Sequence, residues 1–413
     1  MRQPEPTSTA SYSDAVGIVG ADADIAPPAE PSQPRPATIL DVARAVGVSK
    51  ATVSLVLNGR SGTLRISDAT RAAVLATAGH LRYTPNHAAR SLRSRRTGAI
   101  MLIVSRLANP YYGEIAASAL DAARARAYCL DVAEAGTADD EIAALANLWG
   151  GRVDGVVVAT ARRVGDGEQQ QALRAARRDL SRRGLPLVVL LDGSPDPAIA
   201  SIRIDDDAGA YEATRHLAGL GHRRIAHVGY SRLPPGANEH TASADRYRGY
   251  RRALGEVGVV PEPPWLIDDA HGMAGGRKAA EIWLARTPPR PTAVFAATDT
   301  TALGLLRGFH ELGVGVPGDV AIVGFDGIEA GMFSVPALTT VEHPRDDLGR
   351  LGVEALLDAI DGGGDPSAWA TDRVLPVRLV IRESCGATPR HAATPLVRPT
   401  SPAREEESPL ILG

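Results

Sequence analysis

After about residue 37 the chain follows a helical period, with apolar residues returning every three to four positions. Four apolar residues with the spacing i, i+3, i+4 and i+7 precede a glycine: Ile39, Val42, Ala43 and Val46. Gly47 can adopt the left-handed conformation that ends a helix, and Ser49 is a favourable N-cap for the next one. The pattern therefore predicts a short helix, a glycine turn and a second helix.

The second helix would bury Val53, Val56 and Leu57, which repeat the helical spacing. Its outward face would carry four other residues: Lys50, Ala51, Ser54 and Leu55. A third helix is predicted from Ser67 to about Leu81. Two short helices around a glycine turn form either an ordinary helical hairpin or a helix-turn-helix, whose second helix enters the major groove of DNA.

From about Gly98 the pattern changes to short apolar runs separated by amphipathic helical stretches. The runs are "AIMLIVS" (99–105), "YCLDVA" (128–133), "DGVVVAT" (154–160), "PLVVLLD" (186–192), "RIAHVG" (224–229), "TAVFAAT" (292–298) and "VAIVGFD" (320–326). Continuous apolar strands between helices predict parallel sheets that helices cover on both faces. Because nearly 290 residues is large for one such sheet, we expect two similar α/β lobes.

The two ends of the chain have the composition of disordered segments. Residues 1–36 are rich in Pro and Ala, and residues 387–413 are rich in Pro and charged residues. We therefore expect a disordered arm, a helical domain over 37–84, a hinge or linker over 85–97, an α/β core over 98–386 and a disordered tail.

Charge is distributed unevenly along the chain. Residues 37–97 contain ten Lys or Arg and two Asp, a net charge of +8, whereas the whole chain has a formal net charge of −3. The remainder therefore carries −11. A small basic module on a large acidic body indicates that the module binds a polyanion such as DNA, which favours the helix-turn-helix interpretation.

The composition also argues against several other classes of protein. No run of 18 apolar residues is present, so we expect no membrane span. The acidic, Pro-rich N-terminus lacks the basic and apolar regions of a secretory signal. Cys129 and Cys385 form neither a disulfide framework nor a metal-ligand pattern. We expect a cytoplasmic protein without a metal site or a cofactor.

Seven motifs of the chain resemble the lactose/galactose-repressor (LacI-type) family of bacterial transcription regulators. They are "TILDVARAVGVSKATVSLVLNG", "VLATAGHLRYTPNHAARSLR", "NPYYGEI", "HLAGLGHRRIAHVG", "TDTTALGLLRGF", "VPGDVAIVGFDG" and "PALTTVEHP", in the order of the family. They cover about Ala37 to Gly386. The resemblance implies a helix-turn-helix head, a hinge helix and a core with the periplasmic-binding-protein-like fold. This core has two parallel α/β lobes joined by three crossings, which we place near residues 204, 318 and 343.

For the head, the resemblance implies how individual residues contact DNA. Lys50 and Ala51 match recognition-helix positions that contact base edges, and Leu55 matches a third, at which many relatives have Arg or another polar residue. An aliphatic side chain offers only apolar contact, for example to a thymine methyl, so the operator sequence stays open. Ser49, Thr52 and Ser54 match phosphate-positioning residues, and for Ser49 a helix cap explains the residue equally well.

The segment Asn86–Arg93 resembles the family's hinge helix, which orders on the operator and lies in the minor groove. Leu92 matches the leucine that wedges between base pairs, and the alternative is a buried core leucine. The DNA-contacting residues implied for this segment are Asn86, Ala89, Arg90, Leu92 and Arg93. The resemblance implies that four arginines meet phosphates, namely Arg90, Arg93, Arg95 and Arg96. By themselves these arginines could form a solvated charge run.

For the core, the resemblance implies an effector in the cleft between the lobes, and parallel α/β sheets generally bind ligands at the carboxyl ends of their strands. The motif "SRLANPYYGEI" follows the first strand, with Asn109 as N-cap and Pro110 in the first helical position. Tyr111 and Tyr112 would then lie in the first turn, at the cleft mouth. They would form a stacking surface for the ligand or pack in the core at the lobe interface.

Four polar residues complete the expected effector site. Asp299 follows the strand "TAVFAAT", and the resemblance implies that it binds effector hydroxyls or ring nitrogens; the alternative is an N-cap. Arg246, in "ADRYRGY", matches the effector-gripping arginine, and a guanidinium suits a polyhydroxylated ligand. His271 stands where relatives have a stacking aromatic, or is a surface histidine. Asp192, at the end of "PLVVLLD", is a weaker candidate, and Thr298 stands where relatives usually have Asn.

These observations predict an effector-controlled, homodimeric repressor that binds a palindromic operator in double-stranded DNA and a small sugar-like effector. A solute-binding receptor for transport would share the fold of the core but would need a signal peptide and no basic head. An enzyme would use Asp299, Arg246 or His271 as acid or base, but we find no nucleophile–base motif, phosphate loop or metal-ligand cluster. The run Asp205–Asp207 precedes a helix, and we expect it to supply the cap and the dipole partners.

Overall fold

The computed structural model of the chain describes residues 37–57, 66–83, 96–160, 167–191, 196, 199–229, 241–268, 270–362 and 372–387. The chain divides into two compact units, Met1–Asn86 and His87–Gly413. The division falls inside the linker expected over 85–97. We call the described parts of these units the head and the body, and each is considered by itself.

The described part of the head consists of three helices. They are α1 (Ile39–Val46), α2 (Lys50–Leu57) and α3 (Asp68–His80). Gly47 ends α1 in the left-handed conformation, with a φ of 74°. Val42, Val53 and Val74, one from each helix, are fully buried and form the centre of the small core. The predicted helix, glycine turn and second helix are confirmed.

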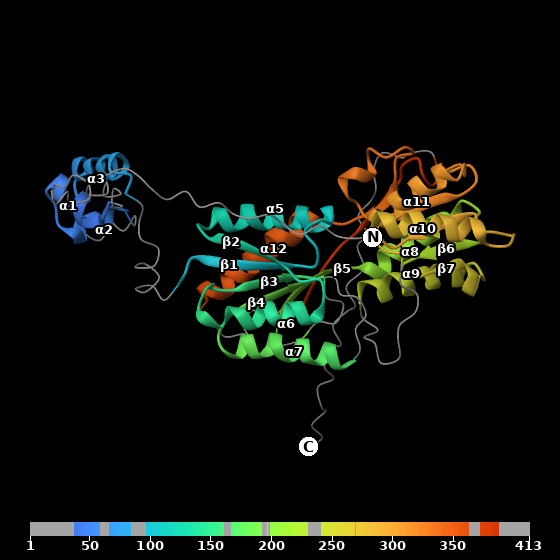
Figure 1. Cartoon of the computed structure of the whole chain (residues 1–413), viewed down its shortest axis with the longest axis horizontal. Coiled ribbons are helices and arrows are strands. Elements are labelled where there is room, and N and C mark those ends of the chain that lie inside the picture. Colours follow the sequence, from blue (N-terminus) through green and yellow to red (C-terminus); the bar gives the residue numbers. More distant parts are fainter. Residues whose placement is uncertain are drawn as a thin grey trace, which may run out of the picture. The chain divides into compact units, whose positions relative to one another are not determined.

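The N-terminal lobe of the body is a six-stranded parallel sheet (Figure 1). Across the sheet, its strands are β11 (Asp372–Leu375), β5 (Ala200–Ile204), β4 (Leu187–Leu190), β3 (Val156–Ala159), β1 (Ala99–Val104) and β2 (Cys129–Glu134). Its helices are α5 (Pro110–Ala125), α6 (Ala138–Ala146), α7 (Gly167–Arg182) and α12 (Arg345–Asp361), with a short turn of 3-10 helix after α6. Leu102 and Ile103 of β1 lie in two different clusters, with residues of α5 and α12 in one and of α6 and α7 in the other. Helices therefore cover both faces of this sheet, as the continuous apolar runs predict.

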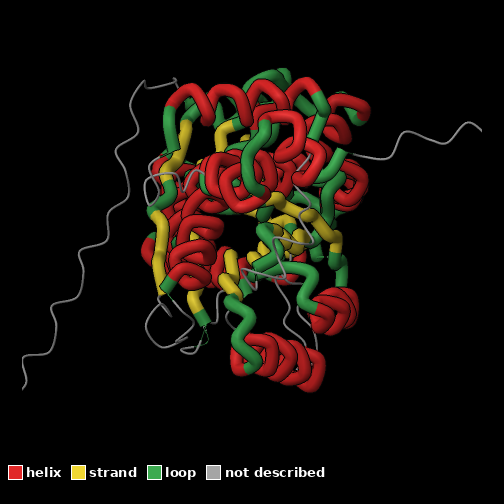
Figure 2. Tube along the Cα trace, turned by 90° about the vertical axis from the view of Figure 1, so that its left-hand side faces the viewer, coloured by secondary structure: helices red, strands yellow, loops and turns green. Residues whose placement is uncertain are grey.

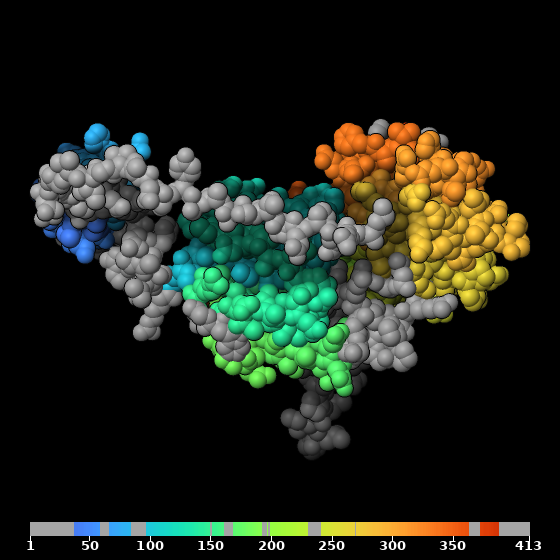
Figure 3. Space-filling view, in the orientation of Figure 1, coloured from blue at the N-terminus to red at the C-terminus, as the bar shows by residue number. Residues whose placement is uncertain are grey.

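The C-terminal lobe repeats this architecture with one difference. Across its sheet, the strands are β12 (Arg378–Val380), β10 (Thr339–Glu342), β9 (Ala321–Asp326), β8 (Ala293–Ala296), β6 (Ile225–Val228) and β7 (Leu266–Ile267). Its helices are α8 (Asp206–Gly219), α9 (Ala242–Glu256), α10 (Gly272–Ala285) and α11 (Asp299–Glu311). All the pairings are parallel except that of β12 with β10, which is antiparallel. Figure 2 shows the strands of the body flanked by helices, and Figure 3 shows the yellow and orange surface of this lobe beside the cyan and green surface of the N-terminal lobe.

The chain crosses between the two sheets at three places. It leaves the N-terminal sheet after Ile204, returns after Glu342, and crosses again between Leu375 and Arg378. The expectation of a crossing near residue 318 is wrong, because Gly318 lies between α11 and β9, which belong to the same lobe. The third crossing joins two short strands near the C-terminus of the core that no apolar run had marked.

Both sheets have the doubly wound strand order, in which the second strand lies outside the first and the third lies on its other side. In such sheets the order reverses between the first and third strands, and ligands bind outside the carboxyl ends of the strands at this point. In the body, these ends are those of β1 and β3 in one lobe and of β6 and β8 in the other. The side chains that follow these strands are therefore the first place to look for a site.

Candidate functional site

The exposed face of α2 matches the predicted DNA-reading surface. Ser49 Oγ accepts a hydrogen bond from the backbone N–H of Thr52 at 3.1 Å, so Ser49 is the N-cap of α2. Lys50 and Ala51 in the first turn are exposed, and Leu55 is half-buried one turn later. The helix thus presents its N-terminal turn to solvent while Val53 and Val56 are buried.

Several predicted site residues lie outside the described residues. They are Asp192 of the expected effector site and the hinge residues Asn86, Ala89, Arg90, Leu92 and Arg93. Their roles stay predictions. Ser54 and Thr52 of the head are half-buried on α2, and their contact with phosphates is likewise a prediction.

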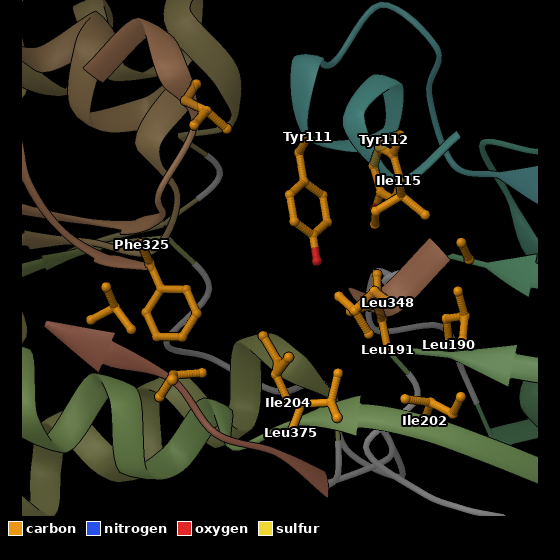
Figure 4. Close-up of a cluster of buried hydrophobic side chains, with 14 of the residues drawn as sticks. Tyr111, Tyr112, Ile115, Leu190, Leu191, Ile202, Ile204, Phe325, Leu348 and Leu375 are labelled. Atoms are coloured by element: carbon orange, nitrogen blue, oxygen red, sulfur yellow. The ribbon is translucent and has the colours of Figure 1, made fainter. Parts of the chain in front are cut away.

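Tyr111 and Tyr112 lie in the first turn of α5, where Asn109 Oδ1 accepts a hydrogen bond from the backbone N–H of Tyr111 at 3.2 Å. Both tyrosines are only 5% exposed, and their rings meet edge to face with centroids 5.2 Å apart. In Figure 4 the Tyr111 hydroxyl points away from α5, with Phe325 of the C-terminal lobe on one side and Leu348 of the N-terminal lobe on the other. The pair is thus buried between the lobes, rather than forming an open stacking surface at a cleft mouth.

Arg246 is the centre of a buried charge cluster at the carboxyl edge of the C-terminal sheet. Its Nε donates to Asp206 Oδ1 at 2.7 Å, and its Nη1 donates to the Ala297 carbonyl at 2.5 Å and to Asp326 Oδ1 at 3.4 Å. The guanidinium carbon lies 3.8 Å from the centre of the Phe325 ring, a cation–π distance. The arginine is therefore already held by groups of its own lobe.

Asp299 is fully buried and is not the cap of its helix. Thr298 caps α11, because its hydroxyl accepts a hydrogen bond from the backbone N–H of Thr301. The Asp299 carboxylate instead accepts from the backbone N–H of Ile328 at 2.9 Å and from the Thr340 hydroxyl at 2.5 Å. A side chain at Gly324 on β9 would collide with this carboxylate, so glycine at that position permits its close approach. Asp299 thus ties α11 to β9 and β10.

His343, directly after β10, lies between Tyr111 and this charge cluster. Its ring centre is 5.0 Å from that of Tyr111, and its Nε2 is 3.6 Å from Asp326 Oδ1, which is beyond hydrogen-bond distance. Within the described residues, both ring nitrogens of His343 and the hydroxyl of Tyr111 are buried without a hydrogen-bond partner. Buried polar groups in folded proteins are almost always paired, so these atoms have hydrogen-bonding capacity for ordered water or for a bound molecule.

Burial dominates the protonation of this cluster. It raises the pKa of Asp206 to about 6 even though Arg246 opposes the shift, so burial outweighs the ion pair. It also raises the pKa of Asp326 and of Asp299, and the carboxylate of Asp326 adds to the shift at Asp299. Burial lowers the pKa of Arg246, but Asp206 and Asp326 more than offset this effect. Burial, followed by Arg246, lowers the pKa of His343 well below its usual value, so this ring is neutral at neutral pH.

The three aspartates 205–207 have three different roles. Asp205 Oδ1 accepts from the backbone N–H of Ala208 and caps α8, as expected. Asp207 instead pairs with Arg248 and Arg252 of α9, and Asp206 belongs to the Arg246 cluster. The expected cap is confirmed, and Asp206 and Asp207 are acids of the first turn of α8 that also pair with arginines of α9.

Asp326 and His343 are members of this cluster that the sequence did not predict. Asp326 ends the predicted strand "VAIVGFD", the same signal that drew attention to Asp299, whereas His343 follows a strand that was not predicted. His271, the N-cap residue of α10, makes no side-chain cap hydrogen bond and is half-buried.

The surroundings of the cluster are partly apolar and include a groove. No group of three or more His, Cys, Asp or Glu that could hold a metal ion occurs among the described residues. A groove of about 610 Å³ borders the cluster at the lobe crossings, and its lining includes His343, Arg345 and Leu375. In Figure 4 the Tyr111 hydroxyl points toward a group of apolar side chains that includes Leu348 of the N-terminal lobe and Phe325 of the C-terminal lobe. Apolar walls with a few convergent polar groups are typical of a small-molecule site.

Comparison with known proteins gives consistent matches for both units. Residues 38–86 match the bacterial regulatory proteins of the lacI family, and residues 214–385 match the periplasmic binding protein-like domain. The chain is 33% identical over 355 residues to the HTH-type transcriptional repressor PurR of Erwinia tasmaniensis, covering 86% of this chain and 98% of the relative. It is 32% identical to the ribose operon repressor of Haemophilus influenzae, covering 84% and 98%.

Solved structures of similar proteins include complexes with DNA and with sugars. The lac repressor dimer bound to operator and the anti-inducer ONPF has a TM-score of 0.71 at 28% identity, covering 86% of this chain and all of that one. The transcriptional regulator CelR in complex with cellobiose has a TM-score of 0.59 at 31% identity, covering 84% and 99%.

Because Arg246 is buried with its partners, we expect its loss to destabilise the body. Replacing Arg246 with Met leaves Asp206 and Asp326 buried without their cation, which costs about 3–5 kcal/mol for a buried pair. The measurement is urea unfolding followed by tryptophan fluorescence, since Trp149, Trp265 and Trp283 lie in the body. Arg215→Met, which removes the exposed pair with Glu212 on α8, should cost about 1 kcal/mol or less. Equal losses in both variants would contradict a stabilising role for the buried cluster.

The buried carboxyl of Asp299 predicts a pH dependence of stability with a defined sign. The folded state binds this proton more tightly than the unfolded chain does, so the contribution favours folding at low pH and is lost as the pH rises through the raised pKa. An Asn side chain at this position does not ionise, so it avoids the cost of burying a charged carboxylate at high pH. The free energy of unfolding of Asp299→Asn, relative to the unchanged protein, should therefore increase between about pH 4 and pH 8. Asp131→Asn, at an exposed position on β2, controls for the amide; a falling or flat difference for Asp299→Asn would refute the prediction.

Proposed function

Because this chain belongs to the lacI family of bacterial regulatory proteins, we propose that it is an effector-responsive transcriptional repressor that binds a palindromic operator as a homodimer. The match over residues 38–86 covers the described helices of the head, and the relatives named as repressors align over almost their whole length. A transport receptor of the same fold would need only the body. The basic head, with its net charge of +8 over residues 37–97, argues for DNA.

We infer that α2 reads the major groove through its exposed first turn. Lys50 is the cation of this turn, and Ala51 beside it is small enough to let the helix approach the base edges. Leu55 offers an apolar contact. Leu92, in the segment before the body, is the residue we propose as the minor-groove wedge. One head reads one half-site, so a palindrome requires two copies of the chain.

We infer that the effector is an uncharged, polyhydroxylated molecule of sugar-like size. The observation that carries this proposal is the pair of buried, unpartnered groups on Tyr111 and His343, which face each other between the lobes. A hydroxyl group can both donate to and accept from these groups. The cations beside this place are already matched by acids, Arg246 by Asp206 and Asp326 and Arg345 by Glu114, which does not favour an anionic ligand.

The surroundings of Tyr111 also fit a sugar ring. Phe325, Ile204 and Leu375 provide apolar surface of the kind that packs against the C–H faces of a sugar. Two similar structures carry sugars in their descriptions, cellobiose for CelR and ribose for a regulator from Enterococcus faecium. We propose that Arg246 and Asp299 act in this site chiefly by fixing the ends of β8, β9 and β10, while Tyr111 and His343 meet the ligand.

We further propose that the protein works in the cytoplasm, where its operator is, and that it is not an enzyme. In the described part of the chain, no helix has both the length and the apolar composition of a membrane span. The chemistry of the site disfavours catalysis. Its polar groups are a neutral imidazole, a phenol and carboxylates that already accept hydrogen bonds from backbone, hydroxyl or arginine donors. None of these is paired as nucleophile and base.

The DNA-binding proposal is tested by selecting duplexes from a random library with the purified protein. We expect a palindromic site bound by two chains, with affinity falling steeply as salt increases; about 6–10 phosphate contacts would give a log–log slope of that order. Lys50→Ala should weaken binding to the selected duplex about tenfold or more, since a base contact contributes about 1–3 kcal/mol.

Lys278→Ala is the matched control, because it removes an exposed lysine of α10 in the C-terminal lobe and should leave DNA affinity unchanged. Binding by a single chain, or binding that does not respond to salt, would rule out the proposed mode. Equal behaviour of the two lysine variants would remove Lys50 from the interface.

The effector proposal is tested by calorimetry with a panel of pentoses, hexoses and disaccharides. Tyr111→Phe removes only the unpartnered hydroxyl, so we expect unchanged or slightly higher stability but about tenfold weaker binding of the sugar that the unchanged protein selects. Tyr250→Phe is the matched control: its hydroxyl donates to the Ile225 carbonyl at 2.7 Å, so its loss should lower stability and leave sugar affinity unchanged. Unaltered sugar binding by Tyr111→Phe would move the site elsewhere.

A further inference from the structure

The chain enters the body through a firmly held segment at residues 96–98. Asp154 accepts three hydrogen bonds there: from the Thr97 backbone N–H at 2.6 Å, from the Thr97 hydroxyl at 3.0 Å and from the Gly98 backbone N–H at 2.8 Å. Arg96 is held separately. Its Nη1 donates to Asp361 Oδ1 at 2.6 Å, and its Nη2 donates to the Ile360 carbonyl at 2.6 Å. These two hydrogen bonds are with the end of α12, and Arg96 also interacts with Tyr128.

The opposite end of α12 lies at the candidate effector site. The helix begins two residues after His343, and its first residue, Arg345, donates from Nη1 to the Asp326 carbonyl at 2.7 Å and pairs with Glu114 of α5. Arg345 thereby joins α12, which packs in the N-terminal lobe, to the strand end that carries Asp326 in the other lobe. One helix therefore contacts the candidate site with its first turn and the entry segment with its last.

α12 is a closely packed helix. Its 17 residues span about 25 Å, and Leu348, Val353 and Leu356 along its inner face are fully buried. Gly349 packs so closely on α5 that a side chain there would collide with the Ile115 carbonyl. A packed helix of this kind shifts as a rigid body rather than bending, so a displacement at one end is carried to the other.

We propose that α12 and Arg96 link the effector site to the DNA-binding part of the chain, with Arg96 as the positioning residue that holds the entry segment to the end of the helix. The proposal rests on the proposed function. Arg96 directly follows residues 84–95, which carry the expected hinge positions, so its placement sets where this segment ends and joins the body. The expectation that Arg96 itself meets a phosphate is replaced here by its contacts with Asp361 and Ile360.

The pKa shifts of Arg96 and Asp361 are both in the direction that an ion pair produces. The hydrogen bond from Arg96 lowers the pKa of Asp361, and the same bond raises the pKa of Arg96. The side chains are about half exposed, at 41% for Arg96 and 52% for Asp361, so the pair adds little to the stability of the body. Removing the Arg96–Asp361 pair should therefore weaken the contact between the entry segment and α12 without unfolding the protein.

Arg126 provides a matched control for Arg96. It also pairs with Asp361, at 2.8 Å, and its side chain is also 41% exposed, but it lies at the end of α5 and not on the entry segment. Arg126→Ala removes the same kind of ion pair from the same carboxylate. Only Arg96→Ala separates the entry segment from α12.

The experiment is hydrogen–deuterium exchange of the full chain, with and without a duplex that the unchanged protein has selected from a random library. In the unchanged protein and in Arg126→Ala, DNA binding should alter exchange in residues 342–349, at the start of α12. In Arg96→Ala this distant change should shrink severalfold, while α2 is still protected by the duplex and the unfolding midpoint stays the same. A structural role of Arg96 alone would not alter exchange at the far end of the helix.

Two results would overturn the link. One is an unchanged response at residues 342–349 in Arg96→Ala, and the other is the absence of any response there in the unchanged protein when α2 is protected. An equal loss in Arg126→Ala would also overturn it, because the end of α12 and not the entry segment would then be responsible. Failure of the unchanged protein to select or bind any duplex would instead count against the proposed function.

Discussion

Arg246 carries a permanent positive charge into the interior of the C-terminal lobe, and a buried charge without partners costs several kcal/mol. The lobe meets this constraint by bringing Asp206 from the start of α8, Asp326 from the end of β9 and the Ala297 carbonyl after β8 to one guanidinium. These groups come from distant parts of the chain. The need to pair one arginine therefore fixes the carboxyl edge of the sheet, where a ligand would bind.

Pairing these charges within the protein decides which groups remain for a ligand. Arg246 and Asp299 are occupied by partners of their own lobe, whereas the Tyr111 hydroxyl and the His343 ring are buried and unpartnered within the described residues. The two rings meet edge to face with centroids 5.0 Å apart, so a molecule bound beside this pair would contact both. His343 is followed at once by α12, which makes the same site a natural starting point for a signal that ends at Arg96.

Much of the fold follows from local patterns. The spacing of Val42, Val53 and their neighbours predicts the head, and the long apolar runs predict the central strands of both sheets. The strands that were not predicted are short or lie near a crossing, namely β5, β7, β10, β11 and β12. Their residues pair with a neighbouring strand from elsewhere in the chain, and short segments carry too little periodicity to reveal this. For the same reason the sequence does not reveal the crossing between Leu375 and Arg378, which joins two of these short strands.

By itself the sequence determined the basic helix-turn-helix head, the two α/β lobes and the family to which the chain belongs, because periodicity, charge and motif order are properties of the linear chain. It also indicated Tyr111 and Asp299, which follow strands, and Arg246, which the resemblance to the family pointed to. Only the tertiary structure decided what these residues touch: Asp206 and Asp326 pair with Arg246, Asp299 turns inward to Thr340, and His343 faces Tyr111. Hydrogen bonds and burial depend on residues that are distant in sequence, and no local pattern records them.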